Sequence, residues 1–453
     1  MFLSNVGALL RLAVPMIVSR AGLAAMAIVD AVMVSRYSSN QFAMLGLADG
    51  TLGRLSDVFG AFVMGGLVLV PRAFGAGNLF ECANIWRRSL PPALGLGLAG
   101  ALLGLTGAPL FGLLGQRASL ASGAGTLTAI FGLGSAAALL ALGAAVFLEG
   151  VKRPTIVAAS VIAANLLNFG LNWLLIYGYG GLPALGARGS AISTTLVRFA
   201  LAAALGVYAW KLAAASRPLE AGGGESAPQL QRKLSLASAA VAAVMLLLTA
   251  SLTVFAGWLG PLSLALLAAT FTLNAPVMLI ALGVADATAI RVASADGAAR
   301  SANREGGRPA RAIVQTSVLA TLAVLLAFAA LWACAPQPLA SIFTRDPAMR
   351  EGLAVLIPLA GCLLVLDGIC FIVVSALRAL RDVVWPTGIE LGTMAALVPL
   401  AAWLAFSRSE GVRGLILAAI ASATARAALL VWRFLWLTKP LPGTARPRVA
   451  SST

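Results

Sequence analysis

The sequence predicts an all-α polytopic membrane protein with twelve transmembrane helices, arranged as two six-helix lobes. The 453 residues are 60% hydrophobic, with a mean hydropathy of +0.95, and only 11% are charged. No soluble core of this length needs so much apolar surface. Apolar stretches long enough to cross a bilayer recur along the whole chain, and the second half repeats features of the first.

Each predicted span is an apolar stretch of about 20 residues or more, the length that a helix needs to cross the hydrocarbon core. The twelve spans are 8–34, 46–70, 89–112, 124–147, 155–178, 189–211, 236–259, 262–292, 311–334, 353–377, 386–406 and 413–437. Pro15 in the first span and Pro276 in the eighth predict a local kink or tilt.

The clearest internal repeat closes the fourth span of each half. Leu148–Pro154 in the first half matches Leu377–Asp382 in the second, and Ala187–Gly189 likewise matches Val412–Gly414. Six spans return the chain to its starting side, so both halves enter the membrane in the same orientation. We therefore expect a pseudo-twofold axis along the membrane normal, as in parallel-repeat transporters.

This repeat divides the chain into an N-lobe (residues 1–212, helices 1–6) and a C-lobe (residues 234–453, helices 7–12 and a short cytoplasmic tail). Residues 213–233 are rich in Gly, Ser and Pro and predict a flexible cytoplasmic linker. Arginine and lysine are concentrated in the loops on the side of both termini, which predicts that both termini are cytoplasmic. We expect the location to be the bacterial cytoplasmic (inner) membrane.

Composition also restricts the chemistry. The chain contains no histidine, which removes histidine acid–base chemistry and histidine metal ligands. The four cysteines show no CxxC spacing, so we predict no metal site and no cofactor other than a coupling H⁺ or Na⁺. The net charge of +16 is explained by topology-setting loops rather than by nucleic-acid binding. We expect a monomer whose partners are a small-molecule substrate and membrane lipids.

Acidic side chains inside spans are costly and mark functional sites. Asp367 lies about 16 Å along its helix from Arg378, near the midplane, with no cation within one turn of its own helix. Asp30 lies in the outer third of the first span, and Asp286 lies near the cytoplasmic end of the eighth. We predict ion coupling at all three, against the alternative of static ion pairs or caps. Asp49 and Glu390 lie nearer span ends and are expected to be solvated or to cap helices, and Asp57 is expected to pair with Arg54 on the same helical face.

Buried arginines and amides are the predicted substrate contacts. Arg20 and Arg198 must each find a carboxylate, carbonyl groups or a substrate anion, because arginine stays charged. If either guanidinium lacks an acidic partner, the cargo should carry an anionic group. Amide and hydroxyl groups that line a cavity, or join two helices, are expected at Asn165, Asn168 and Asn172 on one helical face, and at Thr270 and Asn274 on another.

Several short segments, in order along nearly the whole chain, resemble the multidrug and toxic compound extrusion (MATE) family. They are Leu12–Pro15, Val29–Val34, Arg72–Gly77, Glu149–Val151, Asn165–Asn172, Ile290–Val292, Leu366–Gly368 and Ala376–Asp382. The resemblance implies a V-shaped bundle and export of substrate in exchange for H⁺ or Na⁺. It also implies that Asp30, Asn168 and Asn172 line an N-lobe cavity, and that Asp367 lines a C-lobe cavity where a cation binds.

The sequence departs from the family pattern in places that concern the ion. The seventh span reads Leu248–Ser251 without the acid of one branch, and Asn172 stands where the proton-linked branch often has aspartate. The coupling ion is left open.

We expect a MATE-like secondary antiporter that exports organic, cationic or amphiphilic solutes by alternating access. The alternative within transport is a flippase for an anionic or lipid-linked substrate, which the buried arginines favour. A membrane-embedded enzyme is disfavoured by the absence of histidine and of nucleophile or phosphate-binding motifs. An assembly protein with an inactive transport site is a further alternative.

Overall fold

The computed structural model describes residues 2–216, 227–302, 307–344 and 346–439, and the described part is almost entirely helical. The first half contains α1 (Phe2–Tyr37), α2 (Ser39–Ala48), the π-helix η1 (Asp49–Gly53), α3 (Arg54–Val63), α4 (Gly66–Gly75), α5 (Leu79–Leu105), α6 (Gly107–Leu113), α7 (Ala118–Leu133), α8 (Ser135–Gly150), α9 (Pro154–Tyr177) and α10 (Ala187–Ala214). The second half contains α11 (Ala227–Trp258), α12 (Pro261–Ser301), α13 (Gly307–Cys334), α14 (Pro336–Phe343), α15 (Pro347–Ala379), α16 (Val384–Ala402), the π-helix η2 (Trp403–Ser407) and α17 (Gly411–Leu437).

The predicted number of spans is confirmed. Eleven helical segments of the described residues are long and apolar enough to cross a membrane. The pair α7–α8, bent by 42°, brings the number to twelve when it is counted as one span, and it is the fourth in chain order. α3 and α4 together form the second span. Several helices extend beyond their apolar stretches; α11, for example, begins at Ala227, inside the predicted linker. The rest of that linker, residues 217–226, and the tail 440–453 lie outside the described residues.

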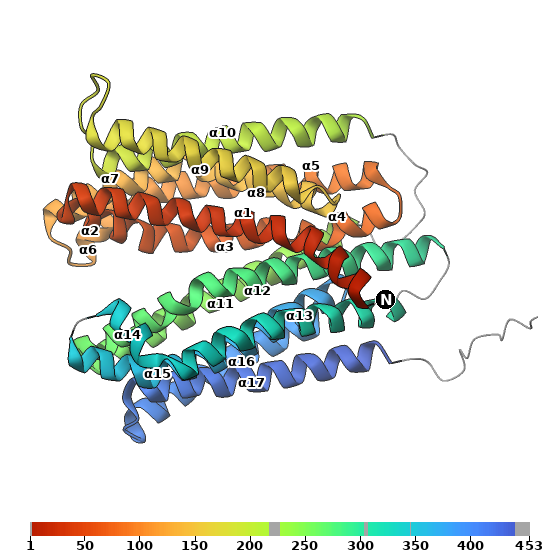
Figure 1. Cartoon of the computed structure of the whole chain (residues 1–453). Coiled ribbons are helices and arrows are strands. Elements are labelled where there is room, and N and C mark those ends of the chain that lie inside the picture. The colour runs from red at the N-terminus through yellow and green to blue at the C-terminus, as the bar shows by residue number, and fades with distance from the viewer. Residues whose placement is uncertain (1, 217–226, 303–306, 345, 440–453) are drawn as a thin grey trace, which may run out of the picture.

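The helices form two bundles, with α1 to α10 in the N-lobe and α11 to α17 in the C-lobe (Figure 1). The start of α1 and the end of α17 lie at the same end of the molecule, which we call the terminus-bearing end. The lobes contact each other through α1 and α4 against α12, and through α3 against α11. The predicted all-α fold with two six-span lobes is confirmed.

Glycines bring α4 and α12 into backbone contact between the lobes. A Cβ atom on Gly75 would overlap the carbonyl oxygen of Ser294, and a Cβ atom on Gly297 would overlap the carbonyl oxygen of Arg72. Each glycine is therefore required by the close approach of the opposite helix. Small residues at such crossings let membrane helices approach closely enough for extensive van der Waals contact.

A buried ion pair lies at the same crossing. Arg72 of α4 places its Nη2 atom 2.8 Å from the Oδ2 atom of Asp296 on α12, and it also donates to the carbonyl oxygen of Ala379 at the end of α15. One N-lobe side chain thus joins two C-lobe helices. Among the described residues, the hydrogen bonds and ion pairs between the lobes use the terminus-bearing halves or the middles of the helices.

We expect Gly297→Ala to weaken the contact between the lobes, because the added methyl group overlaps backbone that cannot move aside independently. Overpacking of this kind costs about 1–3 kcal/mol. The melting temperature of the purified protein should fall. Gly206→Ala on α10, where nothing lies within 4 Å of the new methyl, is the control and should keep or raise it. An equal fall in both variants would contradict the assignment of this crossing as an inter-lobe contact.

Candidate functional site

The N-lobe encloses a cavity of about 450 Å³. Every residue that lines it belongs to the N-lobe, and most are apolar residues of α1, α7, α8, α9 and α10. Its charged lining residues are Arg20, Asp30, Asp49, Asp57, Glu149 and Arg198. An apolar wall with a few convergent polar groups is the usual composition of a site for an organic ligand.

Asp30 of α1 is buried and held by two other helices. Its Oδ1 atom accepts a hydrogen bond from the amide of Asn172 at 2.5 Å, and its Oδ2 atom accepts one from the hydroxyl of Thr194 at 2.6 Å. The amide of Asn168 donates to the Thr194 hydroxyl at 3.4 Å, and its oxygen accepts from Asn172 at 3.0 Å. Asp30 is thereby fixed at the cavity wall by a network that joins α1, α9 and α10.

The three asparagines of α9 share a face, as predicted from their spacing, but that face is not part of the cavity lining. Asn168 and Asn172 are almost fully buried behind Asp30, and Asn165 donates to the carbonyl oxygen of Val161. Of the two alternatives, lining a cavity or joining helices, these hydrogen bonds correspond to the second, and a role in substrate binding stays a prediction. In this arrangement the amides position Asp30 and connect helices.

Arg20 joins the cavity to the opposite lobe. Its Nη2 atom lies 2.9 Å from the Oδ2 atom of Asp286 on α12, and 3.9 Å from the Oε2 atom of Glu149 on α8. Glu149 has only 2% of its side chain exposed, so water screens this group weakly. The paired alternative for Arg20 is therefore the one observed, and the pair connects two lobes.

Arg198 is in a different situation. Its guanidinium donates to the carbonyl oxygen of Phe131 at 3.3 Å and lies 5.5 Å from the centre of the Phe131 ring. Asp49 and Asp30 are the acids whose charge acts on it. Among the described residues, however, none of the recorded ion pairs involves Arg198. This guanidinium lines the cavity with donors left over for a ligand.

The MatE family model matches residues 15–174 and 237–403, most of both lobes. The chain belongs to the MATE family. It is 31% identical to a probable multidrug resistance protein NorM of Caulobacter vibrioides, with 94% of this chain and 90% of the relative covered. A second relative with the same name, from Bradyrhizobium diazoefficiens, is 28% identical, with 96% and 94% covered.

A solved structure of the outward-facing conformation of a multidrug resistance MATE family transporter has a similar fold, with a TM-score of 0.81. The two sequences are 18% identical, and 96% of each chain is covered. Another similar structure is that of the eukaryotic MATE transporter AtDTX14, with a TM-score of 0.81, 19% identity, and 95% and 96% of the two chains covered. The fold of this MATE chain is therefore that of known transporters.

In the C-lobe of this MATE chain, Asp367 has a cationic partner from another helix, as in the ion-pair alternative considered for it. Asp367 of α15 forms an ion pair with Arg426 of α17. Glu390 was expected to be solvated or to cap a helix, yet it is buried and lies 2.7 Å from Arg378. In both cases the partner comes from another helix, because a charge surrounded by hydrocarbon is stable only with a counter-charge or hydrogen bonds.

The remaining predicted C-lobe residues lie between helices. Asn274 of α12 donates to the carbonyl oxygen of Ala360 on α15 at 3.3 Å, and Thr270 donates within α12 to Leu266. Neither lines the N-lobe cavity. Three acids that do line it, Asp49, Asp57 and Glu149, were not predicted as site residues. The sequence indicated Asp49 and Asp57 only as acids of the predicted second span, and Glu149 only as part of the repeated motif.

We expect a double-mutant cycle to show that Arg20 and Asp286 hold the lobes together. Arg20→Gln or Asp286→Asn alone leaves a buried charge without its partner, which costs about 3–5 kcal/mol. The double variant removes both charges and should recover part of the lost thermal stability. The two singles should also change the distance between a spin label on each lobe, measured by double electron–electron resonance.

Glu390→Gln is the matched control, because its ion pair with Arg378 lies within the C-lobe. It should lower thermal stability without changing the inter-lobe distance. If Arg20→Gln leaves that distance unchanged, the pair does not hold the lobes.

Proposed function

We propose that the chain is a secondary antiporter that exports organic, amphiphilic solutes by alternating access, driven by a gradient of H⁺ or Na⁺. The observation that carries the proposal is the N-lobe cavity, which is mainly apolar, contains fixed acids, and is connected to the other lobe through Arg20. The multidrug resistance names of the relatives support organic cargo.

Coupling follows from competition between a cation and an arginine. In the described arrangement Asp286 and Glu149 both face Arg20. A proton or Na⁺ on either acid removes part of the charge that holds Arg20, which weakens the contact between the lobes. A ligand shifts a conformational equilibrium only by its differential affinity for the two states, and an ion that replaces an inter-lobe partner has such a difference.

Asp30 provides a second ion site in the same cavity. Both of its oxygens accept hydrogen bonds, one of them from a hydroxyl. A hydroxyl can rotate from donor to acceptor, so the Thr194 side chain can accommodate a protonated Asp30 without moving its backbone. Asp367 stays a predicted coupling residue, at which the ion would have to displace Arg426.

We further propose that the protein acts as a monomer in the bacterial cytoplasmic membrane with both termini in the cytoplasm. The concentration of arginine and lysine on the terminus-bearing side supports this orientation. The terminus-bearing contacts between the lobes would then close the cytoplasmic side. The ion gradient supplies the energy, and no other cofactor takes part in this scheme.

The second candidate function is a flippase or exporter for anionic cargo, and Arg198 is the observation that favours it. A guanidinium with free donors in the cavity wall can bind a carboxylate or phosphate through two parallel hydrogen bonds. The exposed acids Asp49 and Asp57 lie in the same wall and suit a cationic group. A solute that carries both charges would therefore find a partner for each of them in this cavity.

We expect Asp30→Asn to abolish gradient-driven exchange in proteoliposomes while leaving the protein folded, because asparagine keeps the shape but neither titrates nor carries charge. Separate ΔpH and ΔNa⁺ gradients, applied with a panel of cationic and anionic solutes, identify the coupling ion. Asp346→Asn is the control: this exposed acid caps α15, a role that asparagine performs equally well. Exchange at the wild-type rate in well-folded Asp30→Asn protein would exclude Asp30 from coupling.

Arg198→Gln tests the cargo. Loss of a charge-assisted hydrogen bond is worth about 1.5–3 kcal/mol, so binding of a solute with a carboxylate should weaken roughly tenfold to a hundredfold. Binding of a purely cationic solute should be unchanged or tighter. Arg188→Gln, at an exposed arginine away from the cavity, should change neither. Equal binding of anionic solutes by the wild type and Arg198→Gln would leave cationic cargo as the better assignment.

A further inference from the structure

A second pocket, of about 360 Å³, lies between the lobes outside the N-lobe cavity. Its walls come from α3 and α5 of the N-lobe and from α11 of the C-lobe. The apolar part includes Phe62 and Pro92, and the polar part includes Arg88, Gln231 and Arg232. Any ligand in this pocket therefore contacts both lobes at once.

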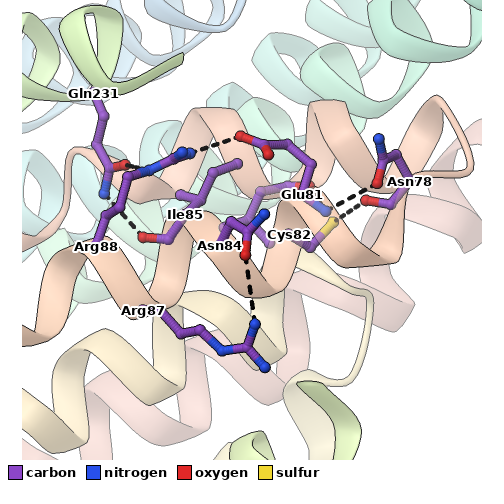
Figure 2. Close-up of polar contacts among 9 residues, drawn as sticks. Asn78, Glu81, Cys82, Asn84, Ile85, Arg87, Arg88 and Gln231 are labelled. Carbon is purple, nitrogen blue, oxygen red and sulfur yellow. Dashed lines mark hydrogen bonds and ion pairs between the residues drawn. The ribbon is translucent and has the colours of Figure 1, made fainter. Parts of the chain in front are cut away.

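One side of the pocket is a fixed polar frame (Figure 2). Arg88 lies 2.6 Å from the Oε1 atom of Glu81 and donates from Nε to the Gln231 side chain at 3.2 Å. Gln231 in turn donates to the carbonyl oxygen of Ile85 at 3.0 Å, which links α11 to α5. Glu81 thus balances the charge of Arg88, while the frame holds both side chains at the pocket wall.

The other cation of the pocket, Arg232, forms no hydrogen bond or ion pair with the residues that the structure describes. The Arg232 side chain is exposed on α11. Because Arg232 lines the pocket, its guanidinium is available to a ligand there. A guanidinium binds a phosphate through its fork of N–H donors.

An apolar stripe continues from Arg232 along α11. Leu236 is four residues further along the helix and 51% exposed, and Leu247, on the same side of the helix, is 67% exposed. Exposed leucines on a membrane-spanning helix face acyl chains. Arg232 and the leucine stripe together place a cation next to an apolar surface, which is complementary to the phosphate and acyl chain of an anionic lipid.

We propose that this inter-lobe pocket binds the headgroup of an anionic glycerophospholipid, with Arg232 on its phosphate and an acyl chain along Leu236 and Leu247. Basic pockets between membrane helices on the cytoplasmic side bind such headgroups. Because the lipid contacts both lobes, it favours the arrangement in which the pocket exists, and it stabilises the protein by mass action. The proposal does not depend on the cargo or on the coupling ion.

The experiment uses the delipidated full-length protein in mixed micelles with phosphatidylglycerol or phosphatidylcholine. We expect phosphatidylglycerol to raise the melting temperature more than phosphatidylcholine does, and native mass spectrometry to detect a retained phosphatidylglycerol. Arg232→Gln should abolish both effects, because it removes the group that binds the phosphate. It should not disturb the fold, because Arg232 forms no hydrogen bond or ion pair with the described residues. Arg117→Gln, at an exposed arginine in the loop between α6 and α7, is the matched control and should keep both.

Three results would overturn the proposal. One is equal stabilisation by the two lipids, and another is the same loss in Arg117→Gln, which would indicate a general effect of charge. The third is stabilisation by inorganic phosphate equal to that by phosphatidylglycerol, because the pocket would then bind a soluble anion without using the apolar stripe.

Discussion

The cost of an unpaired charge in hydrocarbon governs the arrangement of this protein. Several charged side chains inside its spans form an ion pair with another helix: Arg20 with Asp286, Arg72 with Asp296, Arg426 with Asp367. Such pairs add little net stability compared with an apolar core, but removing one member is strongly destabilising. The main effect of each pair is therefore to specify which helices lie together, and its contribution to the stability of the bundle is small.

These pairs divide into two kinds with different consequences. The pair of Asp367 with Arg426 lies within one lobe and can persist while the lobes move as rigid bodies. The pairs of Arg20 and Arg72 cross from one lobe to the other, so the proposed alternating-access cycle would have to break and remake them. An ion or substrate that competes for one of their acids acts directly on the conformational equilibrium. The glycine crossing of α4 and α12 makes this contact close, and closely packed interfaces are not continuously deformable.

The sequence predicted the spans and the two-lobe fold because they depend on local hydrophobicity and on an internal repeat. It also selected Arg20, Asp30 and Arg198, which line the cavity. It could not predict partners, because these are tertiary: Arg20 and Asp286 are separated by 266 residues. A search along one helix found no cation near Asp367, since Arg426 lies on another span. The spacing of the α9 asparagines placed them on one face but could not say that this face holds Asp30.

In the proposed function, the N-lobe cavity would bind both the cargo and the coupling ion, because its charged side chains line one space. Asp30 and Asp49 attract Arg198 electrostatically, and Arg20 lies between Glu149 and Asp286. Neutralising Asp30 leaves Arg198 more attractive to an anion, whereas neutralising Glu149 or Asp286 frees Arg20 from the opposite lobe. In the proposed scheme, an incoming cation would thus change both the affinity of the cavity for cargo and the strength of the contact between the lobes. Two arginines, one paired and one with spare donors, would let a single ion-binding event control both.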